Sequence, residues 1–149
     1  MVRVEASGFH GGEPNENRWN IDRGAIDSYS GRVTLSPTAN WSGQVSFGRL
    51  AHPEALEPGD QTRATASVSY YRPFNGGSIA GSAIWGRVHK TATGTNLNGY
   101  VFESPARFGV RNWVSTRVEL SDKDELFETG PSARVGAYTF GYTRDFYIL

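Results

Sequence analysis

The chain has 149 residues, the length of a single domain that can bury a sizeable core. Its 15 basic and 15 acidic side chains cancel, so no overall field attracts nucleic acid, and nucleic acid is not expected as a partner. The absence of cysteine excludes disulfides, thiolate metal ligands and cysteine nucleophiles.

Alternation of apolar and polar residues between turn residues predicts strands along the whole chain. The eight predicted strands cover residues 1–10, 25–36, 41–51, 61–73, 78–90, 97–108, 112–121 and 134–148. Pro105 falls inside the sixth run and indicates an edge, a bulge or a break there, because proline cannot donate a hydrogen bond to a neighbouring strand.

The connections between these runs alternate in length. "GGEPNENRWNIDRG", "HPEALEPGDQ" and "SDKDELFETGPSA" are long and charged, "KTATGTNL" is intermediate, and "SPTAN", "FNGG" and "GVRN" are short. In an antiparallel up-and-down meander the short turns then share one end and the long loops the other, as in bacterial outer-membrane barrels. We therefore expect an all-β fold of about eight strands, either a closed barrel or a segment of a larger one. It forms one domain over residues 1–149, which we expect to be a piece of a longer chain.

The two rows of side chains on each strand face different surroundings. On the fourth run Ala64, Ala66 and Val68 alternate with Arg63, Thr65 and Ser67. In a membrane barrel the apolar row faces lipid and the polar row faces the lumen, whereas a soluble calyx binding a small apolar ligand reverses this arrangement. Opposite charges at matched depths on the polar rows favour the membrane barrel. The residues expected to face the lumen are Arg3, Glu5, Arg63, Glu103, Arg107, Arg117 and Glu119.

Several motifs together resemble a known family. They are "DSYSGR" at 27–32, "SPTANWSGQVSFG" at 36–48, "PEALEP" at 53–58, "ASVSYYRP" at 66–73, "AIWGR" at 83–87, Glu103-Ser104, "RNWVSTRVE" at 111–119 and "VGAYTFGYTRDF" at 135–146. The chain resembles the C-terminal segment of a family of porin-like outer-membrane β-barrel proteins from Gram-negative environmental bacteria. The resemblance covers most of the chain, but the final "DFYIL" lacks the terminal aromatic residue common in such barrels.

The resemblance implies an outer-membrane location and contact with membrane lipid or detergent. It also implies self-association through any open sheet edge, because unpaired backbone groups cannot be left in lipid. The family supplies no catalytic or binding residues to carry over.

Candidate sites for chemistry lie at the long-loop end. His10, His52 and His89 each come where a strand meets a loop there, so they form a candidate metal site. Trp19, Glu54 and Asp60 on the same loops are candidate ligand-binding residues. No G-x-S-x-G motif is present, so no catalytic residue and no cofactor is predicted, and a small enzyme with a loop-borne site is the weakest alternative.

Overall fold

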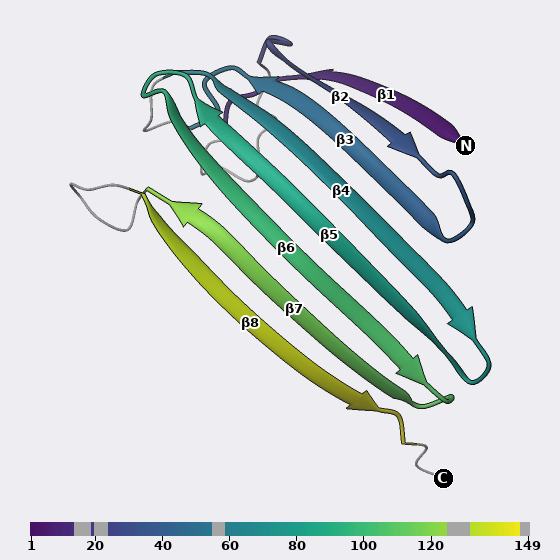
Figure 1. Cartoon of the computed structure of the whole chain (residues 1–149). Coiled ribbons are helices and arrows are strands. Elements are labelled where there is room, and N and C mark those ends of the chain that lie inside the picture. The colour runs from purple at the N-terminus through teal and green to yellow at the C-terminus, as the bar shows by residue number, and fades with distance from the viewer. Residues whose placement is uncertain (14–18, 20–23, 55–58, 125–131, 147–149) are drawn as a thin grey trace.

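The computed structural model describes residues 1–13, 19, 24–54, 59–124 and 132–146. They form one eight-stranded antiparallel sheet whose strands follow one another in chain order (Figure 1). The strands are β1 (Val2–Phe9), β2 (Ser28–Leu35), β3 (Trp41–Leu50), β4 (Gln61–Phe74), β5 (Gly77–Lys90), β6 (Thr95–Phe108), β7 (Asn112–Lys123) and β8 (Ala133–Arg144). All eight predicted strands are confirmed, with ends that differ by a few residues. Residues 147–148 of the last predicted strand lie outside the described part.

The connections alternate between the two ends of the sheet as the meander predicts, but their lengths separate only in part, because the connection after β5 (residues 91–94) is shorter than the turn after β2 (residues 36–40). Tight turns after β2, β4 and β6 lie at one end of the sheet, called the turn end below. The connections after β1, β3, β5 and β7 lie at the other end, the loop end. Gly76 and Gly109 occupy two of the tight turns with φ of 84° and 63°, a backbone conformation that glycine adopts without steric cost.

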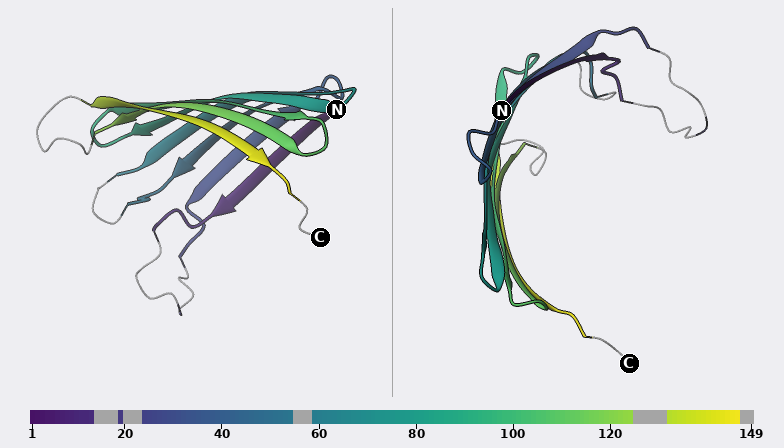
Figure 2. Two further views of the ribbon diagram at one scale, coloured as in Figure 1. Left: turned by 90° about the horizontal axis from the view of Figure 1, so that it is seen from below. Right: turned by 90° about the vertical axis from the view of Figure 1, so that its right-hand side faces the viewer.

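The sheet is open. Within the described residues β1 pairs only with β2, and β8 pairs only with β7. The closed barrel, one of the two forms that we expected, is therefore not formed in this structure. Figure 2 shows the sheet bent like a trough, with the loop end of β1 and the turn end of β8 directed to the same side.

Pro105 lies within an interior strand rather than at an edge. β6 continues through it, and Pro105 pairs with Ser115 of β7. The ladder between β5 and β6 is interrupted opposite Pro105, because pairing passes from Ile79–Ala106 directly to Ser82–Glu103. The hydroxyl of Ser104 donates to the carbonyl oxygen of Ala80 at 2.8 Å, so a side chain supplies a hydrogen bond within this gap. Of the three outcomes expected for Pro105, the structure shows a local break in pairing.

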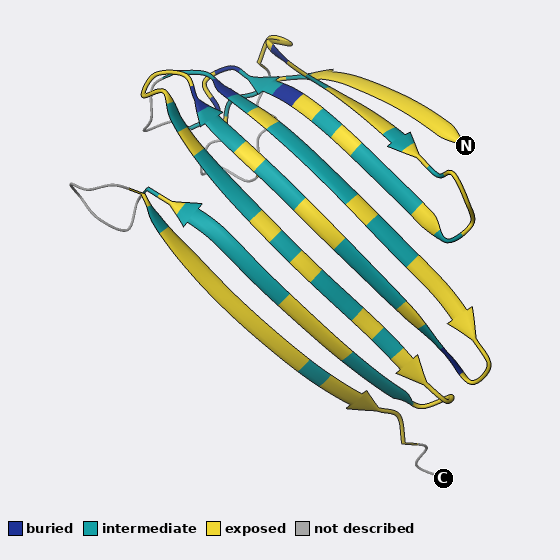
Figure 3. Cartoon of the chain, viewed as in Figure 1, coloured by how far each residue is buried: buried dark blue, intermediate teal, exposed yellow. Residues whose placement is uncertain are grey.

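The sheet has no hydrophobic core of its own. Among the described residues, Ala51 is the single buried hydrophobic one, and exposed residues recur along every strand (Figure 3). The chain exposes 11096 Å², whereas a compact monomer of 16.3 kDa exposes roughly 7,500 Å². The open sheet therefore leaves apolar surface that a stable protein must cover with something else.

Candidate functional site

One face of the sheet carries a continuous apolar band. Residues paired across antiparallel strands point to the same face, so the register assigns every side chain to one of two faces. A row across seven strands shows the apolar one: Val4, Val33, Val45, Ala66, Trp85, Tyr100 and Leu120. The band is open to its surroundings, since Val45 is 57 % and Phe140 75 % exposed.

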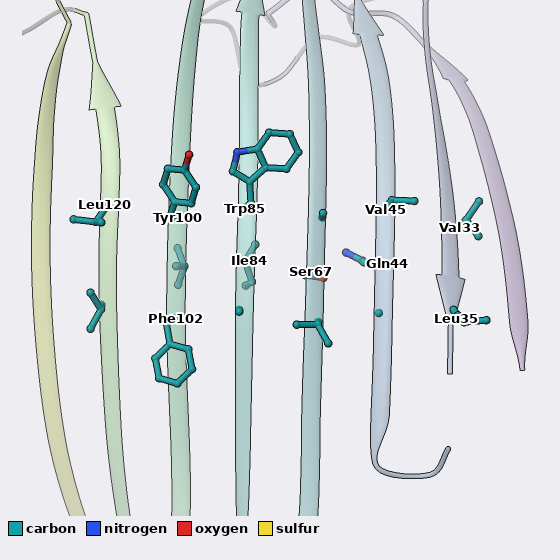
Figure 4. Close-up of a pocket in the computed structure, with 16 residues that line it drawn as sticks. Val33, Leu35, Gln44, Val45, Ser67, Ile84, Trp85, Tyr100, Phe102 and Leu120 are labelled. Carbon is teal, nitrogen blue, oxygen red and sulfur yellow. The ribbon is translucent and has the colours of Figure 1, made fainter. Parts of the chain in front are cut away.

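The apolar band lies on the convex side of the sheet. Figure 4 shows the apolar band face-on, with the side chains of Trp85, Tyr100 and Phe102 in front of the strands. The strands run from β8 on the left to β1 on the right in both Figure 4 and Figure 1, so both figures show the same face of the sheet. Figure 2 shows the sheet bending away from that face. Side chains of the band line a shallow groove of about 800 Å³. Ile84 and Gln44, which belong to the concave face by register, contribute to its base.

Aromatic residues mark both margins of this band. On the loop side they are Tyr29, Phe47, Trp85, Tyr100 and Tyr138, and on the turn side Trp41, Tyr70, Phe74, Phe108 and Tyr142. The rings of Trp41 and Tyr70 lie 4.6 Å apart between centroids. Tyrosine and tryptophan concentrate at membrane–water boundaries because their rings are apolar and their edges polar.

Charged residues follow the loop-side aromatics on the same face. The guanidinium of Arg87 lies 5.5 Å from the centroid of the Trp85 ring, and that of Arg134 lies 5.9 Å from the Tyr100 ring. Arg134 also donates to Asp122 at 2.8 Å. The sequence reasoning above missed this charged row, although Arg87 and Asp122 each stand two positions beyond the last apolar residue of their rows, Trp85 and Leu120.

The loop-side margin crosses the strands obliquely. Following the register from Tyr29 on β2 leads to Asn96 on β6, but the marginal aromatic residue there is Tyr100, four residues nearer the turn end. Tyr100 in turn aligns with Gly136 on β8, where the aromatic residue is Tyr138. The margin thus moves six residues over six strand steps. The rise is about 3.3 Å per residue and the strand spacing about 4.8 Å. For the margin to lie in one plane, the strands must be tilted by about 35° from the normal to that plane.

The turn-side margin moves in the same direction. The register leads from Leu35 on β2 to Phe102 on β6, whereas the last aromatic residue of β6 on this face is Phe108. Along β6 the band therefore runs from Tyr100 to Phe108, roughly 26 Å of strand and about 22 Å of height at this tilt. Transmembrane barrels have strands tilted by about 35–45° and an apolar band about 25 Å tall.

The concave face is predominantly polar and holds all seven residues expected to face the lumen. Arg3 pairs with Glu5 at 3.3 Å within β1. Arg117 contacts Glu119 at 2.6 Å in its own strand and Glu103 at 3.7 Å on the next. These pairs form along one wall, not across an enclosed space. The other two of the seven are Arg63, which donates to Gln61 at 3.2 Å, and Arg107, on β6 near the turn end.

A hydrogen-bonded junction ties the β1–β2 and β3–β4 connections together at the loop end. Asp27 accepts from the backbone N–H of Gly11 at 2.9 Å and from the hydroxyl of Ser28 at 2.8 Å. The Ser28 hydroxyl in turn accepts from the backbone N–H of Ala51 at 2.9 Å. These two donors and nearby His10 hold the pKa of Asp27 below its usual value. The junction escaped the sequence reasoning because its members are far apart in the chain.

This junction predicts an acid-sensitive loop end. Because the pKa of Asp27 is lowered by folding, its stabilisation is present above the unfolded value of 3.8 and is lost as pH falls through the lower folded value. Unfolding in urea should show less loss of stability between neutral pH and pH ~3 for Asp27→Asn than for the natural chain. Identical pH dependence of the two proteins would contradict this role.

The three histidines of the candidate metal site have separate partners. His10 lies 3.3 Å from Asp27, His52 lies 3.7 Å from Asp60, and His89 contacts the side-chain oxygen of Asn96 at 3.1 Å. Within the described ranges, no three His, Asp or Glu side chains converge to hold a metal ion. The structure thus does not bring these histidines together.

The other loop candidates also have different surroundings. Glu54 accepts from Gln61 at 2.8 Å, and Asp60 pairs with Arg49. Trp19 is 97 % exposed. For the weakest alternative, an enzyme, a histidine should meet a serine or a carboxylate in a pocket. His10 does meet Asp27, but the neighbouring Ser28 is 2 % exposed and its hydroxyl is engaged by Asp27 and Ala51.

In the part of the chain that the structure describes, no helix is long and apolar enough to cross a bilayer. Comparisons with protein-family models, with curated proteins and with solved structures found no match for this chain.

Proposed function

We propose that this sheet is part of the wall of a porin-like β-barrel in the bacterial outer membrane. Its convex face contacts lipid and its concave face lines a water-filled lumen. The observation that carries the proposal is the exposed apolar band, which crosses the strands at the oblique angle of a transmembrane wall and is bounded by aromatic residues.

Such a wall requires further strands beside its two open edges. Unpaired backbone groups of β1 and β8 would be costly in lipid, so both edges pair with further strands, supplied by a longer chain or by another copy. Closure of these eight strands on themselves would leave room only for side chains, so solute passage requires the wider barrel. The long loops would then bind ligands or ions at the rim.

A soluble calyx is less well supported. Its apolar row would have to line the interior, and Val45 and Phe102 instead belong to the convex face. Its outer surface would have to be polar, whereas in the observed sheet the concave face carries the row of Arg and Glu residues.

Tryptophan fluorescence tests the orientation directly. Trp41 and Trp85 belong to the convex face by register, and Trp113 belongs to the concave face of the same sheet. In single-tryptophan variants, with the other three replaced by Phe, lipids brominated on their acyl chains should quench Trp41 and Trp85 strongly. Trp113 should be quenched little and should respond to an aqueous quencher.

The opposite pattern, or equal quenching of Trp113 and Trp85, would falsify the orientation. A protein that stays monomeric in buffer without detergent, with Trp41 and Trp85 shielded from aqueous quenchers, would favour the calyx instead. Both outcomes can be read from the same three variants.

A further inference from the structure

The concave face contains a groove of about 500 Å³ over β1 to β4. Its polar lining on this face includes Glu5, Ser30, Arg32, Arg63 and Thr65. The groove meets a second hollow of about 380 Å³ at Arg63 and Thr65, which line both. These two residues therefore lie where the polar hollows of the concave face join.

Two arginines in this groove have no carboxylate partner among the described residues. Arg63 donates to the amide oxygen of Gln61, and no ion pair engages Arg32. Both side chains are exposed. Arg32 aligns with Thr65 through β3, so Arg63 is two strands and two residues away, about 12 Å between Cα atoms in a regular sheet. Two side chains of this length can approach one bound group from both sides.

The acidic side chains beside the two arginines are already engaged, since Glu54, near Arg63, accepts from Gln61 at 2.8 Å. Glu5 lies opposite Arg32 in the register but forms its ion pair with Arg3 at 3.3 Å. The groove therefore keeps excess positive charge. A guanidinium group binds a carboxylate through two parallel N–H···O bonds, which makes an oxyanion the ligand group that fits these arginines.

The surface between the two arginines is small and hydroxylated. Gly48 stands between Ser30 and Arg63 in the register, and a Cβ atom added there would lie 3.3 Å from the Cβ of Ser30. The hydroxyls of Ser46 and Thr65 bond to each other at 2.6 Å. Gly48 thus adds no side chain between the two arginines, and the hydroxyl groups beside it can rotate to donate to a ligand.

The loop side of the groove is apolar. Phe9 and Leu50 line it, share the concave face and are half-buried. A ligand with a flat apolar body and one oxyanion would place the body against Phe9 and Leu50 and the oxyanion at the arginines. Such burial adds affinity in proportion to the apolar area that is covered.

We propose that this groove is a binding site for small aromatic carboxylates, with Arg32 and Arg63 as the carboxylate ligands. Its role as a solute site in a channel wall rests on the proposed function, but binding itself requires only the folded sheet. The overall charge of the concave face does not identify a solute, whereas these two arginines identify small aromatic carboxylates as the solute class.

Calorimetry on the detergent-solubilised protein tests the site with benzoate and its neutral analogue benzamide. Benzoate should bind at least about tenfold more tightly than benzamide, because its carboxylate forms charge-assisted hydrogen bonds that the neutral amide cannot form. Arg32→Gln and Arg63→Gln should each weaken benzoate binding about tenfold and leave the weak benzamide binding unchanged.

Arg107→Gln is the matched control, since Arg107 is an exposed arginine on the same face near the turn end, outside the groove. Equal binding of the two ligands, no benzoate binding, or an equal loss in Arg107→Gln would overturn the site. The calorimetry does not depend on lipid. If benzoate binds but brominated lipids quench Trp113 rather than Trp85, the channel wall is refuted and the binding site is kept.

Discussion

Replacing Val45 with arginine should prevent stable insertion of the sheet into lipid vesicles. Val45 lies between Val33 and Ala66 in the middle of the apolar band and is 57 % exposed on the convex face. An arginine on the lipid-facing side of a transmembrane sheet costs about 2–4 kcal/mol near the bilayer midplane. A loss of this size is a large part of the stability of a domain.

The neighbouring residue provides the matched control. Gln44 precedes Val45 on β3 and points to the concave face, so Gln44→Arg adds the same side chain on the watery side. Phe47→Arg, at the loop-side margin, should cost less than Val45→Arg because the charge lies nearer the headgroups. The measurements are the folded fraction in vesicles and its urea unfolding midpoint. A larger loss for Gln44→Arg than for Val45→Arg would reverse the assignment of the two faces.

The strands were predictable because their signal is local. Alternation in Ala64–Val68 is present in the sequence itself, and a period of two has one structural meaning. Closure was not predictable, because it depends on whether β1 pairs with β8, and these strands lie at opposite ends of the chain. The Asp27 junction was hidden for the same reason, since it joins Gly11, Ser28 and Ala51.

The histidine hypothesis shows the limit of reasoning from topology alone. His10, His52 and His89 follow or end strands β1, β3 and β5, which all run toward the loop end, so placing them at one rim was reasonable. Strands are about 4.8 Å apart, and alternate strands are therefore about 10 Å apart. Side chains two strands apart must bend strongly toward each other to share one ion, and each of these has a nearer partner.

The tilt of the band, by contrast, depends on information that the sequence contains only in part. The aromatic residues can be read from the sequence, but their relative heights require the register between strands. Tyr29 and Tyr100 look equivalent as residues near strand starts, yet they differ by four positions once the ladder is followed. The same residues then indicate a tilted wall rather than a flat sheet.

Replacing Gly77 with alanine should destabilise the sheet at the turn end by about 1–3 kcal/mol, the usual cost of overpacking. A Cβ atom at Gly77 would lie 2.1 Å from the backbone carbonyl oxygen of Arg107 and 2.8 Å from the ring of Phe74. The ring can turn away, but the carbonyl belongs to the neighbouring strand β6, so relief requires β5 and β6 to separate. Urea unfolding in detergent micelles would measure the loss.

Gly86 on the same strand is the control position, because Gly86→Ala makes the same substitution without the clash. A Cβ atom there would have no heavy atom within 4 Å. Gly86→Ala should therefore be neutral or stabilising by about 0.4–1 kcal/mol, because alanine restricts the unfolded chain more than glycine does. If Gly86→Ala lost as much stability as Gly77→Ala, the cost would lie in strand flexibility, and the close approach of β5 to β6 at the turn end would not be the cause.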